Sequence, residues 1–520
     1  MGLEDKDQHP ESEPEAGVTR PGSTNLDTLV LDQNQFQFQF TPQPGSTTNF
    51  DFDMAAEEGQ QSQPLDEKAA KLEDEEIHVL KGWILLNKGI SRRNFYTSWI
   101  FVMYLGFVLI SFTTIEPQYI SKELGVPVES MGETTAMLYL IDYSIRMLCA
   151  LIFGPMIDYF GRKTVMTIGI ILVTLGYTLI PIVSTSLFPG YIIGKAFISS
   201  GVIALSMLPF SADYIDNSTK GVMTGVNYGI GFVGGALCGI LLKSLLLLGC
   251  SYRLIYWIYA PIMFFAGFSL RPGIKGGSTY YKTMKPDIEG GSEENQKSKA
   301  INWGAVKKAY KEIPWVPIAV IFGVLGNTDF YIMTTALMIW LKTLLPVSED
   351  PTLIATTYQV IFFGLSVLTT IVCALKIDKV PHMRMILPMI TMAFLGFLII
   401  PFTSDPKGVL LHIFFIIEGL SLPGVFVFST YLSIRYNPSD IRGTLSAISN
   451  AVSFLAAIVI LSVGGYLHDY WRSDASFILY GGLLFLTLFV VIVIYLRTRK
   501  YNAKPNDVEM IELARATRQT

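Results

Sequence analysis

Long apolar blocks separated by short polar connections make up most of the chain. Each block holds about 20 mostly apolar residues, the length that a helix needs to cross the hydrocarbon core of a bilayer. Because most connections are short, successive helices are expected to run antiparallel. The pattern predicts an all-α membrane protein with twelve transmembrane helices, at residues 96–115, 135–157, 164–184, 190–211, 222–247, 253–270, 315–342, 355–376, 385–403, 409–433, 443–467 and 475–497.

A longer polar segment, residues 271–312, divides the helices into two groups of six. Its last part, from Trp303 to Glu312, has the amphipathic pattern of a short helix at a membrane surface. We interpret the segment as a linker rather than as a regulatory domain. The two groups then predict an N-terminal six-helix bundle over residues 96–270 and a C-terminal six-helix bundle over residues 315–497.

The two groups also share local features at nearly equal spacing. A Lys-Gly pair at 220–221 opens the fifth helix, and an Arg-Gly pair at 442–443 opens the eleventh. Asp158 follows the second helix, and Asp378 follows the eighth. Parallel repeats of this kind suit a transporter that rocks two halves around a site at their interface. The two bundles are therefore expected to be pseudo-symmetric.

Composition supports a membrane protein and argues against two other classes. Hydrophobic residues make up 51% of the 520 residues, and charged residues only 16%. A typical soluble protein has about 25% charged residues. The chain is therefore expected to be neither a soluble enzyme nor an intrinsically disordered protein.

The two ends of the chain differ in composition from the membrane body. Residues 1–77 contain eighteen acidic and four basic residues, together with many Gln, Pro, Ser and Thr. Such a segment has too few apolar residues to offset the entropy of ordering. Residues 1–80 are therefore predicted to form a disordered acidic tail that can recruit cytoplasmic partners. Residues 498–520 are predicted to be a second tail.

The distribution of Lys and Arg predicts the orientation of the helices. One set of connections is rich in basic residues, among them Arg92, Arg162 and those of the linker. The opposite set has few: Lys122, Arg253, Lys342, Lys407 and Arg472. Because basic residues resist translocation, the first set is expected to face the cytoplasm. Both termini and the linker would then be cytoplasmic in a multi-pass protein of the plasma membrane or of an organelle.

One charged motif stands between the second and third predicted helices. It consists of Gly154, Asp158, Gly161, Arg162 and Lys163 in the run Gly-Pro-Met-Ile-Asp-Tyr-Phe-Gly-Arg-Lys. This spacing resembles the signature of the major facilitator superfamily (MFS), with its Gly, Asp, Gly and two basic residues. The first glycine permits close helix contact, the second permits a tight turn, and the charges form ion pairs at the membrane surface. Together with the twelve helices, the resemblance implies the MFS fold.

The resemblance also implies how this motif works. In the family, the aspartate interacts with the start of the eleventh helix and stabilises one state of the transporter. Asp158 is therefore expected near that N-terminus, where the helix dipole favours an anion. Arg162 is expected to pair with an acid after the fourth helix, either Asp213 or Asp216. The second copy at Asp378 lacks the Gly-Arg pair, so a weaker gate is expected there.

Five ionisable residues lie deep within the predicted helices: Asp142, Arg146, Lys195, Asp329 and Glu418. Each is a candidate for solute transport or ion coupling, because such a side chain is costly in a bilayer unless it is paired or hydrated. Asp142 and Arg146 are four residues apart and can equally form a structural ion pair. Lys195 stands near the place of a helix-four arginine of the family, although the accompanying glycine is displaced. Asp329 has no cation on its own helix turn, so a cavity-facing, proton-coupling role is expected for it first and for Glu418 second.

Aromatic and amide residues at comparable depth can line a solute pocket: Tyr104, Tyr139, Asn327, Tyr331 and Gln359. Packing remains the alternative for the aromatic ones, because Tyr at helical spacing is more often a packing residue. The four cysteines lie within or beside apolar segments. They are expected to pack, rather than to form disulfides or to bind metal.

The sequence has no phosphate-binding glycine loop, no metal-ligand cluster and no nucleophile–base spacing. ATP-driven transport, catalysis, a cofactor, a metal and nucleic-acid binding are therefore not expected. The favoured function is a secondary transporter, a symporter or an antiporter, that moves a small organic solute by alternating access. Protons would be coupled if Asp329, Glu418 or Asp142 titrates. The alternative is a non-transporting receptor or scaffold of the same fold, which would bind solute without flux.

Overall fold

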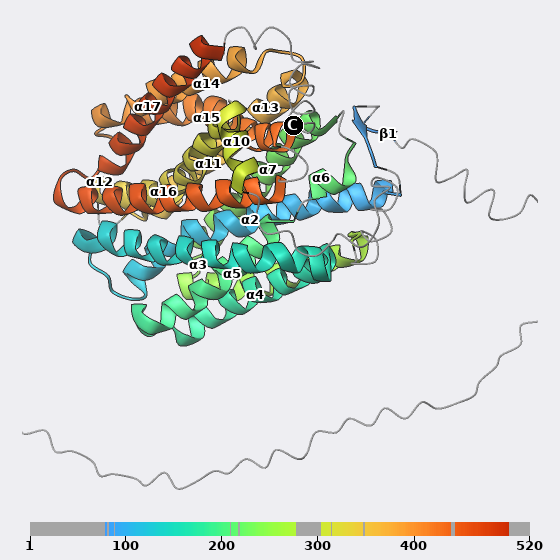
Figure 1. The fold of residues 1–520 in the computed structure, drawn as a ribbon. Coiled ribbons are helices and arrows are strands. Elements are labelled where there is room, and N and C mark those ends of the chain that lie inside the picture. Colours follow the sequence, from blue (N-terminus) through green and yellow to red (C-terminus); the bar gives the residue numbers. More distant parts are fainter. Residues whose placement is uncertain are drawn as a thin grey trace, which may run out of the picture. The chain divides into compact units, whose positions relative to one another are not determined.

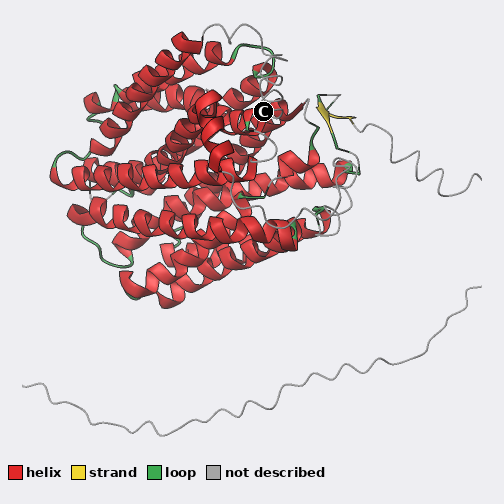
Figure 2. Cartoon of the chain, in the orientation of Figure 1, coloured by secondary structure: helices red, strands yellow, loops and turns green. Residues whose placement is uncertain are grey.

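The computed structural model describes residues 78–80, 83–87, 89–208, 210–216, 219–276, 303–313, 315–346, 349–437 and 442–498. Both predicted tails lie outside the described residues, apart from 78–80 at the end of the first and 498 at the start of the second. The predicted linker is described at its two ends only. Nearly all of the described chain is helical (Figure 2).

The N-terminal half, defined here as residues 92–273, contains six of the membrane-spanning segments. Short 3₁₀ or π-helical turns adjoin three of the long helices. The elements of this half are α2 (Arg92–Lys122), η1 (Val128–Ser130), α3 (Met131–Phe160), α4 (Arg162–Val183), η2 (Leu187–Tyr191), α5 (Ile192–Ser206), α6 (Phe210–Tyr214), α7 (Lys220–Leu247), α8 (Tyr252–Leu270) and η4 (Arg271–Gly273).

The C-terminal half, defined as residues 315–498, contains the other six segments. It follows α10 (Trp303–Glu312), which covers the stretch for which a surface helix is predicted. Its elements are α11 (Trp315–Tyr331), η6 (Ile332–Ala336), α12 (Leu337–Leu344), α13 (Pro351–Lys376), α14 (His382–Phe397), η7 (Ile400–Phe402), α15 (Val409–Tyr436), α16 (Arg442–Tyr470) and α17 (Ala475–Thr498).

The two halves pack side by side with their helices roughly aligned. In Figure 1 the blue and green helices of the N-terminal half lie mostly below the yellow to red helices of the C-terminal half. Two helix pairs make the main contacts between the halves, α3 with α16 and α7 with α13. The twelve-helix, two-bundle fold predicted from the apolar pattern is confirmed.

Apolar side chains cover much of the outer surface of these helices. Leu148, Leu151 and Ile152 on α3 are more than half exposed, as are Phe265 on α8 and Phe489 on α17. A soluble monomer rarely exposes apolar patches of this extent. The exposed surface therefore suits lipid rather than water, and the protein is an integral multi-pass membrane protein.

Local sequence features set where several helices begin. The Ser91 hydroxyl accepts a hydrogen bond from the Asn94 backbone N–H, and the Asn94 side chain accepts one from the Ser91 backbone, so this pair caps α2. Gly161 joins α3 to α4 with a φ of 84°. A side chain is strained in this left-handed region, which explains the glycine at this position of the motif.

Glycines of α7 allow unusually close contact with α2. A Cβ atom at Gly234 would lie 1.9 Å from the backbone oxygen of Met103, and one at Gly106 would lie 2.0 Å from that of Gly231. Any side chain at these positions would force the two helices apart. These glycines therefore serve helix packing.

A small hairpin precedes the first membrane helix. Strand β1 (His78–Val79) pairs antiparallel with β2 (Ile84–Leu85). The backbone of Leu85 then accepts a hydrogen bond from Asp216 N at 3.0 Å. Val79 and Ile84 are buried, so the hairpin packs against the helices.

Candidate functional site

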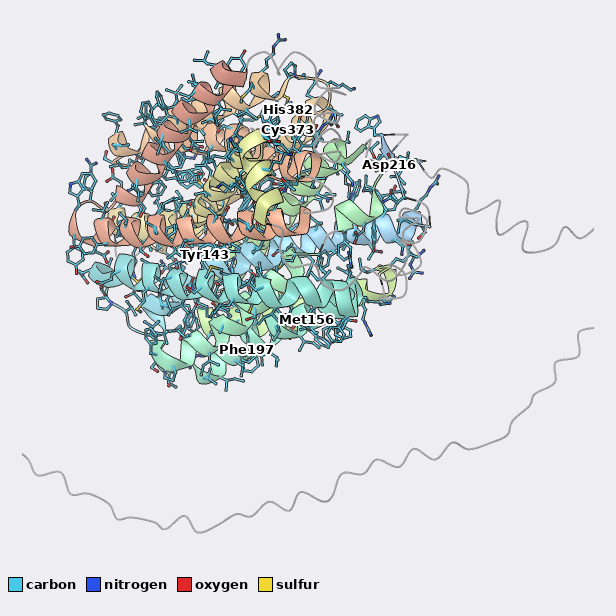
Figure 3. All side chains as sticks on the ribbon, in the orientation of Figure 1. Tyr143, Met156, Phe197, Asp216, Cys373 and His382 are labelled. Atoms are coloured by element: carbon cyan, nitrogen blue, oxygen red, sulfur yellow. The ribbon has the colours of Figure 1, made fainter. Side chains whose placement is uncertain are left out.

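The motif between α3 and α4 defines one end of the helix bundle, called here the Arg162 end. The Arg162 Nε atom lies 3.0 Å from the Asp213 Oδ2 atom, and both side chains are largely buried. Arg162 therefore pairs with Asp213, one of its two predicted partners. Asp216 lies beside the N-terminal hairpin (Figure 3). The side chains of Gly154 and Asp158 are not among the described ones, so the expected contact of Asp158 with α16 stays a prediction.

The second copy of the motif places an aspartate at a helix start. The Asp378 carboxylate accepts hydrogen bonds from the Tyr431 hydroxyl at 2.9 Å and from Arg435 Nη1 at 3.1 Å. It also lies against Gly221 in the first turn of α7, where a Cβ atom would be 2.2 Å from Oδ2. The helix dipole favours an anion there. Although this copy lacks the Gly-Arg pair, its aspartate contacts the other half of the molecule.

A buried ion pair joins α2 to α5 inside the N-terminal half. The Lys195 ammonium donates to Glu116 Oε1, which also accepts a hydrogen bond from the Tyr191 hydroxyl at 3.1 Å. Both charged side chains are fully buried. The Lys195 Nζ atom also lies 4.6 Å from the centre of the Tyr139 ring. Lys195 is thus held by a carboxylate and by an aromatic face.

Glu116 is a site residue that the apolar pattern missed. The predicted first span stops at residue 115, because Glu-Pro-Gln interrupts the apolar run. The helix itself continues through Pro117 to Lys122, which carries Glu116 into the buried interior. A span length of 31 residues, rather than the 20 assumed, would have included it.

A second ion pair lies one helix away, on α3. Arg146 Nη2 is 2.9 Å from Asp142 Oδ2, and Arg146 Nε donates to Asp142 Oδ1 at 3.1 Å. The Ser199 hydroxyl of α5 donates to the same carboxylate. The structure therefore contains the ion pair that the four-residue spacing allows. All four central charges of the N-terminal half have a partner of opposite sign.

Hydrogen bonds connect this charged region to the C-terminal half. The Tyr139 and Thr335 hydroxyls are 2.6 Å apart, and Thr335 also donates to the backbone oxygen of Thr113 at 3.2 Å. The Tyr139 ring packs edge-to-face on Tyr331, with centroids 4.7 Å apart. Nearby, the Tyr143 hydroxyl donates to the backbone oxygen of Asn327 at 3.0 Å, and Figure 3 shows Tyr143 where the two halves meet.

Thr335 lies in a π-helical turn of the seventh membrane segment. This turn, η6, interrupts the regular helix between α11 and α12. The Gln359 amide of α13 donates to the backbone oxygen of Met333 at 3.3 Å and accepts from the Thr114 hydroxyl at 3.3 Å. Single π-helical turns of this kind occur frequently at functional sites. The predicted pocket residues Tyr139, Tyr331 and Gln359 therefore gather at one junction of the two halves.

The carboxyls of the C-terminal half have no cation as partner among the described residues, although Glu418 Oε2 accepts a hydrogen bond from the Ser421 hydroxyl at 3.5 Å. Asp329 on α11 and Glu418 on α15 are fully buried and interact electrostatically with each other. Among the described residues, Asp329 Oδ1 and Glu418 Oε1 have no hydrogen-bond partner, and neither side chain forms an ion pair. Tyr480 of α17 interacts with both carboxyls, and Glu418 also contacts Gly396 of α14.

The groups that interact electrostatically with the carboxyl pair belong to the C-terminal half. The cavity-facing role expected for Asp329 stays a prediction. Tyr331, two residues further along α11, packs against α3 across the interface. Two residues correspond to about 200° of helix rotation. The Asp329 side chain therefore points away from the N-terminal half.

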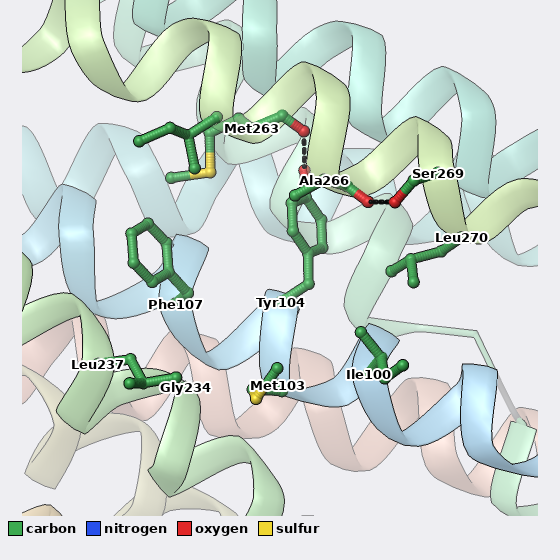
Figure 4. A pocket seen from close by; sticks show the side chains of 11 residues that line it. Ile100, Met103, Tyr104, Phe107, Gly234, Leu237, Met263, Ala266, Ser269 and Leu270 are labelled. Carbon is green, nitrogen blue, oxygen red and sulfur yellow. Dashed lines mark hydrogen bonds between the residues drawn. The ribbon is translucent and has the colours of Figure 1, made fainter.

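Tyr104 is not part of this junction. It lines a separate apolar cavity of about 190 Å³ between α2, α7 and α8, together with Met103, Phe107 and Met263 (Figure 4). Its hydroxyl donates to the backbone oxygen of Met263 at 3.1 Å. Burial of the ring and satisfaction of its hydroxyl favour a packing role for Tyr104.

The described residues offer no group of His, Cys, Asp and Glu that could hold a metal ion. The four cysteines are free thiols in this structure. Cys238 and Cys373 are buried between helices, and Cys373 is labelled in Figure 3.

Twelve membrane-spanning helices in two six-helix halves, with buried charges near their junction, define a polytopic protein of the transporter type. The family model of the Major Facilitator Superfamily matches residues 96–461. The chain belongs to this superfamily, as its motif between α3 and α4 suggests.

Two relatives come from the bacterium Paramagnetospirillum magneticum. The magnetosome protein MamH is 20% identical over 386 residues, which are 71% of this chain and 84% of that protein. The magnetosome protein MamZ is 20% identical over 388 residues, which are 72% of this chain and 59% of that protein.

Two solved structures share the fold. A D-xylose-proton symporter has a TM-score of 0.56 at 13% identity and covers 77% of this chain and 97% of its own. The human organic anion transporter MFSD10 has a TM-score of 0.53 at 14% identity and covers 77% of this chain and 100% of its own. At this level of identity the likeness concerns the fold alone.

Proposed function

We propose that the protein is a secondary transporter that moves a small organic solute across a membrane by alternating access. Protons drive it through the carboxyls of the C-terminal half. The superfamily and the fold support transport in general. The proton coupling rests on one observation, the unpaired burial of Asp329 and Glu418.

Proton coupling follows from the cost of a buried charge. An ionised carboxylate within a membrane protein costs several kcal/mol unless a cation or hydrogen-bond donors compensate it. Two such groups beside each other also repel. A proton on one or both carboxyls removes this cost. A change of shape that hydrates the pair would release the proton, which is the exchange that coupling requires.

The proposed solute path runs between the halves at the junction of Tyr139, Thr335 and Gln359. In this structure these groups bond to each other across the interface. A solute with hydroxyl, carbonyl or amide groups would replace these bonds when the halves separate. The paired charges at Lys195 and Asp142 support the junction from inside the N-terminal half. No catalytic step is part of this proposal.

We further propose that the Arg162 end faces the cytoplasm. The connections at this end carry most of the basic residues, and basic residues resist translocation. The end that contains Lys122 and Asp350, called here the Asp350 end, would then face outside or the lumen of an organelle.

Flux through reconstituted vesicles tests the proposal. A thermal-shift screen of metabolites first identifies a solute that stabilises the purified protein. A pH gradient is then expected to drive its accumulation, and Asp329→Asn is expected to reduce this accumulation while solute exchange at equal pH continues. Binding without flux by the unmodified protein would contradict transport and favour the receptor alternative. Full pH-driven accumulation by Asp329→Asn would remove this residue from coupling and make Glu418→Gln the variant to test.

A further inference from the structure

Asp469, near the end of α16, contacts the other half of the molecule at the Asp350 end. Its Oδ1 atom accepts a hydrogen bond from the Gly132 backbone N–H at 3.0 Å, and its Oδ2 atom accepts one from Glu133 at 2.7 Å. Both donors belong to the first turn of α3, whose N–H groups have no partner within their own helix. A carboxylate of the C-terminal half thus caps a helix of the N-terminal half.

The two helices reach this geometry through a glycine contact. A Cβ atom at Gly465 would lie 2.5 Å from the backbone oxygen of Gly132, and one at Gly132 would lie 2.6 Å from that of Gly465. The backbones therefore touch, and Asp469 follows Gly465 by one helical turn. This spacing places its carboxylate over the start of α3.

A second aspartate joins the halves at the same end. The Asp350 carboxylate, which caps α13 through the Thr352 backbone N–H, lies 2.6 Å from Lys122 Nζ at the end of α2. It also accepts hydrogen bonds from the Tyr252 hydroxyl of α8 at 3.0 and 3.1 Å. Burial raises the pKa of Asp350, but the hydrogen bonds from Lys122 and Thr352 outweigh burial and hold this pKa below its ordinary value.

We propose that Asp469 and Asp350 form a latch that holds the Asp350 end closed and must release before this end can open. The inference rests on the proposed alternating access. Both carboxylates belong to the C-terminal half, and all the N-terminal groups that they bind, on α2, α3 and α8, would separate from them when the halves rock. Charge-assisted hydrogen bonds between the halves stabilise the state in which the Asp350 end is closed. They are lost when this end opens.

The latch is the counterpart of the motif at the Arg162 end. There, Asp158 at the end of α3 is expected to contact the start of α16; here, Asp469 near the end of α16 caps the start of α3. The two helices run antiparallel, so each aspartate would close one end. Loss of Asp469 and loss of Asp158 should therefore shift the conformational equilibrium in opposite directions.

Distance measurements between spin labels test the latch in purified full-length protein without any solute. Cysteines replace Leu248 and Phe402, which are exposed at the Asp350 end on opposite halves, in a chain whose four native cysteines are alanine. Asp469→Ala is expected to increase the population with long distances about fivefold or more. Asp474→Ala is the matched control, because Asp474 bonds to Arg472 in the same loop. Its distances should stay unchanged.

Further variants keep the test decisive. If Asp469→Ala does not fold, Asp469→Asn and Asp350→Asn remove charge while they retain an acceptor oxygen, and both should shift the distances in the same direction. Asp158→Asn should shift them the opposite way. Unchanged distances in folded Asp469 and Asp350 variants would overturn the latch. A normal shift in a protein that shows no flux would contradict transport but leave the latch in place.

Discussion

The N-terminal half buries two acidic and two basic side chains near its centre and pairs each of them, whereas the C-terminal half buries Asp329 and Glu418 with no ion-pair partner among the described residues. The halves share one helix arrangement, so the difference lies in side chains and not in topology. A paired buried charge is a structural element, and breaking it is costly. A buried carboxyl without a cation beside it can bind and release a proton. We therefore attribute the proposed support of the solute junction to the N-terminal half and the proposed proton coupling to the C-terminal half.

The largest expected effect is on stability. Lys195→Met leaves the Glu116 carboxylate buried without its cation and is expected to destabilise the protein by about 3–5 kcal/mol. The double variant Glu116→Gln with Lys195→Met should recover most of this loss, because neither charge then remains. Asp329→Asn should cause no comparable loss, since it removes a group that already lacks a partner. Thermal unfolding midpoints in detergent measure all three, and an equal loss in Lys195→Met and Asp329→Asn would erase the difference between the halves.

The next effect is on coupling. Asp329→Asn and Glu418→Gln are each expected to lower pH-driven accumulation about tenfold or more, which corresponds to about 1.4 kcal/mol of lost coupling free energy. Exchange of labelled solute at equal pH should continue in both. Tyr480→Phe, which removes a nearby hydroxyl but no carboxyl, is the matched control. A proportional fall of accumulation and exchange would indicate general damage instead of lost coupling.

A smaller effect is expected at the Arg162 end. Arg162→Ala removes the charge-assisted hydrogen bond to Asp213, and Asp158→Asn weakens the expected contact with α16. Both should slow transport while membrane insertion stays largely intact. Asp213→Asn should reproduce the Arg162 effect. Normal flux at normal surface levels in the Arg162 and Asp158 variants would remove the gate assignment.

The smallest effect is expected at the N-terminus. Deletion of residues 2–60 should change flux only slightly, by the equivalent of about 0.5 kcal/mol or less in activation free energy, the size of a surface-substitution effect. The reason is that this segment has neither a span nor a compact apolar pattern. Ile84→Asp in the hairpin should do more, since Ile84 is fully buried near the chain that carries Asp213. Flux by correctly inserted protein measures both. Loss of flux on deletion alone would show that the tail takes part in transport.

The apolar pattern was sufficient to predict the helices, because each membrane span is a property of about twenty consecutive residues. The ion pair of Asp142 with Arg146 could also be predicted, because the two residues lie one turn apart on one helix. The partner of Lys195 could not be predicted, since Glu116 lies on another helix and directly before Pro117, where the apolar run is interrupted.

The direction of Asp329 could not be predicted for a related reason. A helix that is apolar all round has no polar face that reveals its orientation, and α11 is of this kind. The contacts of Tyr331 with Tyr139 and of the Asn327 backbone with Tyr143 show which side of α11 meets the N-terminal half. The depth of Asp329 along the chain was enough to predict its burial. Its neighbours could be named only from the packing of α11, α14, α15 and α17.

The most direct test of the difference between the halves is infrared spectroscopy of the purified protein, because protonated and ionised carboxyls absorb at different frequencies. Spectra recorded across a pH titration should show a protonated carboxyl band that loses intensity in Asp329→Asn and in Glu418→Gln. The band should be unchanged in Glu116→Gln and in Asp142→Asn, whose carboxylates are paired with cations. A band that survives both C-terminal variants, or that disappears with either N-terminal one, would contradict the assignment of proton binding to the C-terminal half.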